Sequence, residues 1–232
     1  MRSLDTEAGR RRIGQAAWVM AGVGVVVGQL HALARFATAD GSEDLESPLT
    51  AVWARPAGQA LRPLLDWADS NLVYLHYGKV WFGVFAALTL CAWLVYRRRQ
   101  PAGAERWVWR VTLVGYLVAT VGVFVSYWTQ WRPDYTEPWF TLGWYLDIPG
   151  LVLTLFGSSV LGVILLAKRF RPVLPAALLA LALPLAVGIV QVTSLGNAVL
   201  PIAVAFGLLG WRMARVAPGQ DAPTRDRATV GA

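Results

Sequence analysis

Two histidines are the side chains of this sequence whose type and position best suit cofactor chemistry. His31 and His76 each lie about five residues inside one end of a long apolar stretch, a depth on the order of 8 Å at 1.5 Å per residue. Neutral imidazole is a good ligand for haem iron, so two histidines at one depth predict a b-type haem held between two helices. Cys91 cannot join them, because it lies roughly 22 Å from His76 along the same helix. We predict no other metal site.

A larger group of polar residues lies at the same ends of the apolar stretches and forms the second candidate site. Polar groups inside a membrane are costly, so their placement points to binding. We expect them to line an outward-facing cavity for a quinone head group, a lipid head group or a small anionic solute. The group consists of Gln29, His31, Arg35, His76, Lys79, Asp147, Gln191 and Asn197. The alternative is a structural role, since charged residues near helix ends extend to lipid head groups and histidines form hydrogen bonds between helices.

Motifs of the common enzyme classes are absent from the sequence. It contains no phosphate-binding glycine loop, no HExxH zinc pair and no GxSxG nucleophile turn. Its single cysteine excludes an internal disulfide and a CxxC redox pair. Its basic clusters lack interleaved exposed aromatic residues, which argues against nucleic-acid binding. The sequence therefore favours a non-catalytic protein and assigns no enzymatic reaction.

Six apolar stretches must position the candidate residues. The chain has 232 residues, of which 56% are hydrophobic and 15% charged, whereas a soluble domain carries about a quarter charged residues. These stretches have about the 20 residues that are needed to cross a bilayer as a helix, and the last of them is the shortest. The stretches are residues 17–36, 71–96, 107–128, 146–167, 173–193 and 197–213. The predicted fold class is all-α, a polytopic integral membrane protein with a bundle of six transmembrane helices.

The last two stretches leave two topologies open. Residues 197–213 are few for a crossing, and they follow the preceding stretch almost at once. The two stretches are therefore either full crossings or the halves of a re-entrant pair. Pro175, Pro184 and Pro201 fall in or near them and predict kinks.

The first stretch is also open to a second interpretation. The basic residues 10–12, the apolar run 16–30 and the small residues 37–39 resemble a cleavable secretory signal. The stretch is long enough to span the membrane when His31 and Arg35 lie near its outer end, and we expect it to be retained. Cleavage would leave five helices and remove His31.

Charge is distributed unevenly over the predicted loops. The side that carries the termini holds 16 Lys/Arg and 5 Asp/Glu, and the opposite side holds 5 Lys/Arg and 9 Asp/Glu. By the positive-inside rule, both termini are cytoplasmic, and Trp residues at the ends of the stretches are typical of aromatic belts. Arg accounts for 19 of the 21 basic residues. Because this bias is typical of a GC-rich bacterial genome, we expect the bacterial plasma membrane.

The chain divides into three predicted parts. Residues 1–16 form a cytoplasmic segment, residues 17–213 form the membrane domain, and residues 214–232 form a disordered cytoplasmic tail. Within the membrane domain, residues 38–70 begin acidic and continue with apolar residues at helical spacing, which prolines interrupt. This pattern predicts two short amphipathic helices that cap the bundle on the outer side.

These features support three functional hypotheses. The first is a non-catalytic multi-pass plasma-membrane protein, an accessory, assembly or sensor-like subunit whose outer cap contacts a partner or lipid. The second is a transporter for a small solute bound near Arg35, Lys79 and Asp147. The third is a redox protein that binds haem or a quinone at His31 and His76. The expected partners are the lipid bilayer and either another membrane protein or a second copy of the chain, and not nucleic acid.

Overall fold

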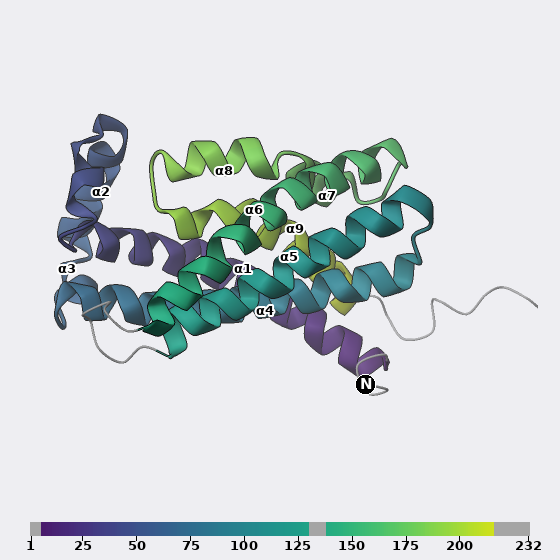
Figure 1. The fold of residues 1–232 in the computed structure, drawn as a ribbon, viewed down its shortest axis with the longest axis horizontal. Helices are drawn as coiled ribbons and strands as arrows, with labels where there is room; N and C mark the ends of the chain where they lie inside the picture. Colours follow the sequence, from purple (N-terminus) through teal and green to yellow (C-terminus); the bar gives the residue numbers. More distant parts are fainter. Residues whose placement is uncertain (1–5, 130–137, 216–232) are drawn as a thin grey trace, which may run out of the picture.

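The computed structural model describes residues 6–129 and 138–215, and every regular element in these ranges is a helix. The longer helices run side by side, and two short ones lie across one end (Figure 1). The longer elements are α1 (Glu7–Phe36), α4 (Ser70–Arg99), α5 (Gly103–Trp128), α6 (Pro138–Ala167), α7 (Val173–Ala180), α8 (Ala182–Val190) and α9 (Leu200–Arg215). The short elements are η1 (Ser42–Glu46), α2 (Pro48–Ala60), α3 (Arg62–Leu65) and η2 (Leu195–Val199). This architecture confirms the predicted all-α membrane bundle.

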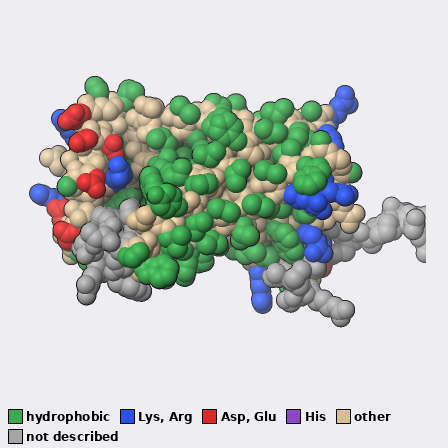
Figure 2. Space-filling view, viewed as in Figure 1, with side chains coloured by type: hydrophobic (Ala, Val, Ile, Leu, Met, Phe, Trp, Pro, Cys, Tyr) green, Lys and Arg blue, Asp and Glu red, His purple; other side chains and the backbone are tan. Residues whose placement is uncertain are grey.

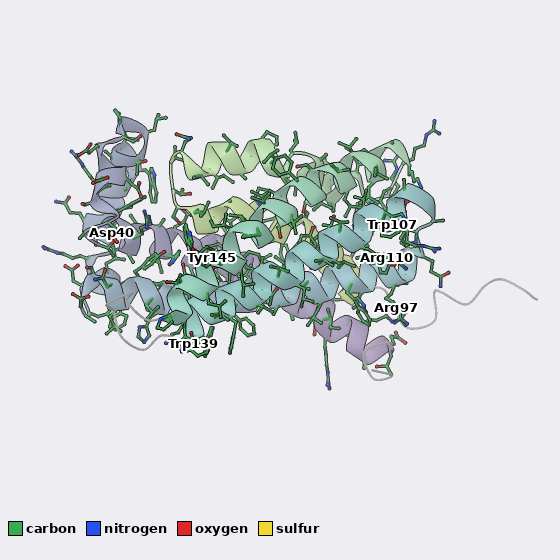
Figure 3. All side chains as sticks on the ribbon, in the orientation of Figure 1. Asp40, Arg97, Trp107, Arg110, Trp139 and Tyr145 are labelled. Atoms are coloured by element: carbon green, nitrogen blue, oxygen red, sulfur yellow. The ribbon has the colours of Figure 1, made fainter. Side chains whose placement is uncertain are left out.

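The surface of the bundle separates apolar from charged side chains. Green apolar side chains cover the middle of the molecule, and charged side chains gather at its two ends (Figure 2). The end with α2 and α3 carries the acidic residues 40, 43, 44, 46, 66 and 69, and we call it the acidic end. The opposite end carries the basic residues 97–99, 106, 110, 168, 169 and 171, and we call it the basic end. Figure 3 labels Asp40 at the former and Arg97 and Arg110 at the latter. An apolar belt between two charged ends is the surface that a bilayer requires.

Local sequence signals set the ends of the helices that carry the site. The Thr6 hydroxyl caps α1 by accepting a hydrogen bond from the backbone of Gly9 at 3.1 Å. Consequently α1 starts well before residue 17, inside the segment predicted to precede the membrane domain. Asp69 caps α4 by accepting a backbone bond of 2.9 Å from the first turn. Gln100 ends α4 in the left-handed conformation, with φ of 46°. The predicted tail is helical to residue 215, and its remainder, residues 216–232, lies outside the described ranges, as do residues 1–5.

The fifth predicted stretch, residues 173–193, is divided between α7 and α8, which meet at an angle of 59°. Pro184 explains the break, since it has no N–H for the carbonyl of Ala180 and its ring crowds that carbonyl. The pair nevertheless connects the two ends of the bundle. Lys168, just before α7, pairs with Glu105 at the basic end, while the backbone of Gln191, just after α8, is bonded to α2 at the acidic end.

The bent pair decides how many crossings the bundle has. Five helices in the described ranges are individually long and apolar enough to span a membrane, and the bent pair, taken as one span, makes a sixth. One of the five extends over residues 195–215, longer than the predicted 197–213. Of the two topologies left open by the sequence, full crossings agree with the way the bent pair joins the two ends of the bundle, and the predicted kink lies between α7 and α8.

Small residues bring the helices into close contact, as is usual between membrane helices. Gly14 of α1 and Gly210 of α9 pack backbone against backbone, and a Cβ atom on Gly210 would lie 2.6 Å from the carbonyl oxygen of Gly14. Gly150 of α6 lies against α5 in the same way, where an added Cβ would be 2.6 Å from Ala119 N. Close packing at these points fixes the distances between neighbouring helices, including α1, α5 and α6, which line the site described below.

The helices α2 and α3 form the predicted cap. Pro63 stands in the first turn of α3, where its missing N–H breaks no helical bond, so the chain bends at Leu61 between the two helices. Trp53 Nε1 of α2 donates to the carbonyl of Val192 at 2.6 Å, and the Thr50 hydroxyl donates to the carbonyl of Gln191 at 3.3 Å. These two bonds fasten α2 to the chain that follows α8, and so hold the cap over the acidic end of the bundle.

Candidate functional site

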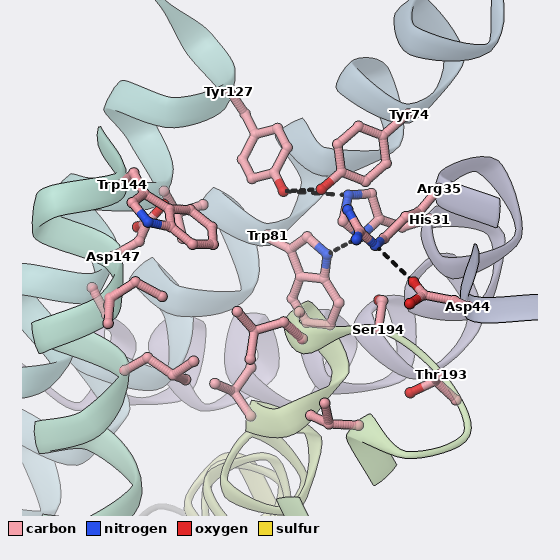
Figure 4. A pocket seen from close by; sticks show the side chains of 18 of the residues that line it. His31, Arg35, Asp44, Tyr74, Trp81, Tyr127, Trp144, Asp147, Thr193 and Ser194 are labelled. Atoms are coloured by element: carbon pink, nitrogen blue, oxygen red, sulfur yellow. Dashed lines mark hydrogen bonds and ion pairs between the residues drawn. The ribbon is translucent and has the colours of Figure 1, made fainter. Parts of the chain in front are cut away.

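A cavity of about 480 Å³ lies beneath the cap, between α1, α4, α5, α6 and the segment that joins α8 to α9. Its volume falls in the range of about 300–1,000 Å³ that is usual for small-molecule sites. Figure 4 shows its polar and aromatic side chains converging from several helices. The lining comprises His31, Arg35, Glu43, Asp44, Ser47, Thr50, Tyr74, Trp81, Phe85, Ala119, Val123, Tyr127, Trp144, Asp147, Ile148, Leu151, Val190, Gln191, Thr193, Ser194, Leu195, Gly196 and Val199.

His31 is the most enclosed polar residue of the cavity wall. It is 2% exposed, and its ring stacks on that of Tyr74 with centroids 4.4 Å apart. Trp81 Nε1 lies 3.1 Å from His31 Nδ1, and His31 Nε2 lies 3.4 Å from the hydroxyl of Tyr127. Indole N–H is only a donor, so Nδ1 must accept and the ring proton lies on Nε2, directed to Tyr127. His31 is therefore a neutral imidazole that joins α1 to α4 and α5.

Arg35 lies one helical turn beyond His31, where α1 ends. Its Nε donates to Asp44 Oδ2 at 3.1 Å, so η1 folds back over the end of α1 (Figure 4). The Thr38 hydroxyl donates to the carbonyl of Arg35 at 2.6 Å and fixes the turn between the two helices. Gly41 fits there because an added Cβ would collide with the backbone of Arg35. The cation of the cavity is thus already paired with a carboxylate.

Asp147 projects from α6 toward α5 on the other side of the cavity. Ser126 donates a hydrogen bond of 2.5 Å to its Oδ2 atom, and Gly122 leaves room for Oδ1 because a Cβ there would collide with it. That Oδ1 atom is buried and has no hydrogen-bond partner among the described residues. Trp144 lies one turn earlier on the same helix and also lines the cavity (Figure 4). Asp147 therefore places a carboxylate beside an aromatic wall.

The segment between α8 and α9 supplies the remaining wall. Ser194 is 4% exposed, Asn197 is fully buried, and neither side chain has a hydrogen-bond partner within the part of the chain that the structure describes. Asn197 lies directly behind the wall, where its Oδ1 atom occupies the space that a Cβ atom on Gly28 would need. A Cβ atom on Gly28 would also lie within 3.2 Å of the Trp81 ring. Buried polar atoms without partners are rare in folded proteins. The buried polar atoms of Ser194 and Asn197 therefore indicate that this wall can form hydrogen bonds with a ligand.

The structure brings together part of the predicted polar group. His31, Arg35, Asp147 and Gln191 line the cavity, and Asn197 lies behind its wall. The others of the predicted group, Gln29, His76 and Lys79, are not part of its lining. The Lys79 ammonium instead lies 5.9 Å from the centre of the Trp128 ring.

The predicted pairing of His31 with His76 is not formed. His76 is exposed, its Nδ1 lies 2.8 Å from the carbonyl of Leu72, and its ring contacts Trp67 with centroids 5.4 Å apart. His31 stacks instead on Tyr74, two residues earlier on α4 and so on the opposite face of that helix. Both nitrogens of His31 are also engaged with Trp81 and Tyr127. Two axial ligands for one haem are therefore not presented by these two histidines.

Five aromatic residues of the site are not in the predicted group. They are Tyr74, Trp81, Phe85, Tyr127 and Trp144. Aromatic residues near the ends of membrane helices are typical of interfacial belts. Because the Trp residues of the sequence were assigned to such belts, aromatic residues were not identified as part of a cavity. A signal was present on α4, where positions 74, 81 and 85 share one helical face that also carries no charged residue.

Comparison with family models, curated sequences and solved structures finds no match for the chain. The described ranges also contain no group of three or more His, Cys, Asp or Glu side chains that could hold a metal ion. The function is therefore inferred from the residues that line the cavity.

Proposed function

We propose that the chain is a non-catalytic, multi-pass membrane protein that binds a small amphipathic molecule in the cavity beneath its cap. The observation that carries the proposal is the composition of the lining. Phe85, Val123 and Leu151 form an apolar floor, while polar and aromatic side chains surround the cap side. A ligand with an apolar body and a polar end matches these two surfaces.

The charges of the lining favour a neutral or positively charged ligand over an anionic one. One cation, Arg35, stands against three carboxylates, those of Glu43, Asp44 and Asp147. Because Arg35 is paired with Asp44, the remaining charge is negative. Aromatic rings such as Trp144 attract organic cations through their electron-rich faces. We therefore propose a small organic amine or ammonium compound, or a neutral molecule of similar shape.

The cap supports a sensor-like or accessory role. The hydroxyl side of Thr50 lines the cavity, whereas Leu49 and Val52 of the same helix are 64% and 74% exposed. A ligand that shifts α2 would thus change a surface available to a partner protein or to lipid. We also propose that the protein lies in the bacterial plasma membrane, on the excess of Arg over Lys. The charge difference between the two ends supports an orientation with the basic end and both termini in the cytoplasm.

Filling the cavity tests the proposal. Leu151→Trp places an indole in the floor, and Leu142→Trp makes the same change at a position that is 44% exposed on the same helix. Binding of phenyltrimethylammonium and of benzenesulfonate, which share a ring and differ in charge, is measured by calorimetry on the detergent-purified proteins. We expect the cation to bind wild type and Leu142→Trp, and Leu151→Trp to bind neither compound. Equal binding of the cation by all three proteins would contradict a ligand site in this cavity.

Transport is the second candidate, and the irregular backbone between α8 and α9 favours it. Non-helical backbone at membrane depth is typical of segments that line a solute pathway. Thr193→Cys introduces a thiol in the cavity, whereas the native Cys91 is fully buried. A transporter predicts that membrane-impermeant thiol reagents reach residue 193 from both sides of a vesicle, and a binding protein predicts access from the acidic end alone. Ala39→Cys, exposed at the acidic end, serves as the one-sided control.

A further inference from the structure

A second hollow lies at the basic end, where α4 turns into α5. It measures about 350 Å³ and is lined by Tyr96, Arg97, Gln100, Pro101, Arg106 and Arg110. We call it the arginine notch. It shares no residue with the cavity beneath the cap, so nothing that follows depends on the proposed function.

The hairpin between the two helices gathers the three arginines of the notch. The left-handed Gln100 ends α4 just after Arg97, and α5 begins at Gly103. Arg106 and Arg110 are one turn apart and therefore share a face of α5. Figure 3 labels Arg97, Arg110 and Trp107 close together at this end.

Protein contacts hold the guanidinium groups of Arg106 and Arg110 in place without neutralising them. Arg106 Nε donates to the carbonyl of Pro101 at 3.0 Å, and Arg110 Nε donates to the hydroxyl of Tyr96 at 3.4 Å. No carboxylate of the described ranges pairs with Arg106 or Arg110. The neighbouring carboxylate, Glu105, is buried and already bonded to other cations of this end. Like charges on one face repel, and an anion bound in the notch would relieve this repulsion.

The apolar surface below the notch identifies the kind of anion. Leu90 lies seven residues before Arg97 on α4 and is 43% exposed, and Leu117 lies seven residues after Arg110 on α5 and is 57% exposed. Seven residues bring a side chain back to the same face, about 10 Å deeper in the membrane. Trp107, 67% exposed, lies beside the notch at the level of an interfacial belt. A phosphate in the notch and hydrocarbon along the two leucines are the two parts of one phospholipid.

We propose that the arginine notch binds the head group of an anionic phospholipid, with its acyl chains along the exposed faces of α4 and α5. Guanidinium groups suit this ligand because their N–H groups match phosphate oxygens in a fork. A zwitterionic lipid offers the same phosphate with a compensating ammonium, so the notch should distinguish the two by charge.

The test compares lipids with identical acyl chains and different head groups. Phosphatidylglycerol, phosphatidylcholine and inorganic phosphate are each titrated into the detergent-purified protein, and bound lipid is counted by native mass spectrometry. The double variant Arg106→Gln/Arg110→Gln is matched by Arg55→Gln/Arg62→Gln, which removes the same charge from exposed positions at the acidic end.

We expect phosphatidylglycerol to bind wild type and the control more tightly than phosphatidylcholine does. The notch variant should bind phosphatidylglycerol about thirtyfold more weakly, since each basic side chain near anionic lipid contributes about fivefold. If the double variant does not fold, Arg110→Gln alone should give about a fivefold loss. Equal binding of both lipids, or an unchanged preference in the notch variant, would overturn the proposal. Competition by inorganic phosphate at the same concentration would also overturn it, in favour of a site for free phosphate.

Discussion

Replacing Trp81 with phenylalanine should destabilise the bundle by removing one hydrogen-bond donor. Trp81 Nε1 donates to His31 Nδ1 at 3.1 Å, and the two side chains are 3% and 2% exposed. The phenyl ring retains much of the apolar contact of the indole. His31 Nδ1 would then be buried without its donor, and the ring would lose the contact that fixes its tautomer.

Two known ranges bound the size of this effect. Hydrogen bonds between transmembrane helices contribute about 0.6 kcal/mol on average and about 1.7 kcal/mol at most. A buried acceptor left without a donor costs about 1–3 kcal/mol. Because the substitution leaves the acceptor in place, we expect the free energy of unfolding to fall by about 1–2 kcal/mol. Part of that loss is the smaller ring, which a double-mutant cycle with His31→Leu separates from the hydrogen bond.

Reversible unfolding in mixed detergent micelles, followed by circular dichroism, measures the four proteins of the cycle. We expect a coupling energy of about 1 kcal/mol between positions 31 and 81. Trp139→Phe is the control, since Trp139 is 54% exposed, and its effect should stay within about 0.5 kcal/mol. A coupling energy below about 0.3 kcal/mol, which is the scatter for independent sites, would refute the hydrogen bond as a stabilising contact.

Three other substitutions test the packing and the cap. Gly210→Leu forces a side chain into the backbone of Gly14 and should cost about 1–3 kcal/mol by thermal unfolding, whereas Gly22→Leu points into open space; equal effects would contradict the close contact of α1 and α9. Glu105→Gln removes the carboxylate that two cations share, and should cost about 1–3 kcal/mol at low salt; no loss would mean that this buried group adds nothing to stability. Trp53→Phe removes the bond from α2 to the chain after α8, and should speed amide exchange in α2 about fivefold without changing exchange in α5; uniform exchange would contradict a separate movement of the cap.

Much of the fold was predictable because membrane insertion acts on each helix by itself. Length and hydropathy locate a crossing without reference to its neighbours. Pro184 likewise predicts a kink from local sterics alone, and the structure has a break there. The extension of α1 back to Glu7 was not predicted, because its cap Thr6 lies in a polar segment that hydropathy does not assign to a membrane helix.

The site was predictable only in part, because a helix face has no direction until its neighbours are known. His31, Arg35 and Asp147 were predicted from the cost of polar groups in a membrane, and that cost applies wherever they point. His76 obeys the same rule but lies on the opposite face of α4 from Tyr74. Trp81 and Tyr74 carry no such cost, so only the packing of α1 against α4 identifies them as part of the cavity.

The contact of Gly14 with Gly210 also has a consequence for the order in which the bundle is assembled. It joins the first long helix of the described chain to the last one, so the face of α1 that α9 covers is vacant while all the helices between them are being synthesised. Contacts between distant parts of a chain form slowly, since a long loop must close first. Completion of the bundle therefore waits for α9, and a nascent chain that stops before it leaves a groove of small residues open to lipid or to a chaperone.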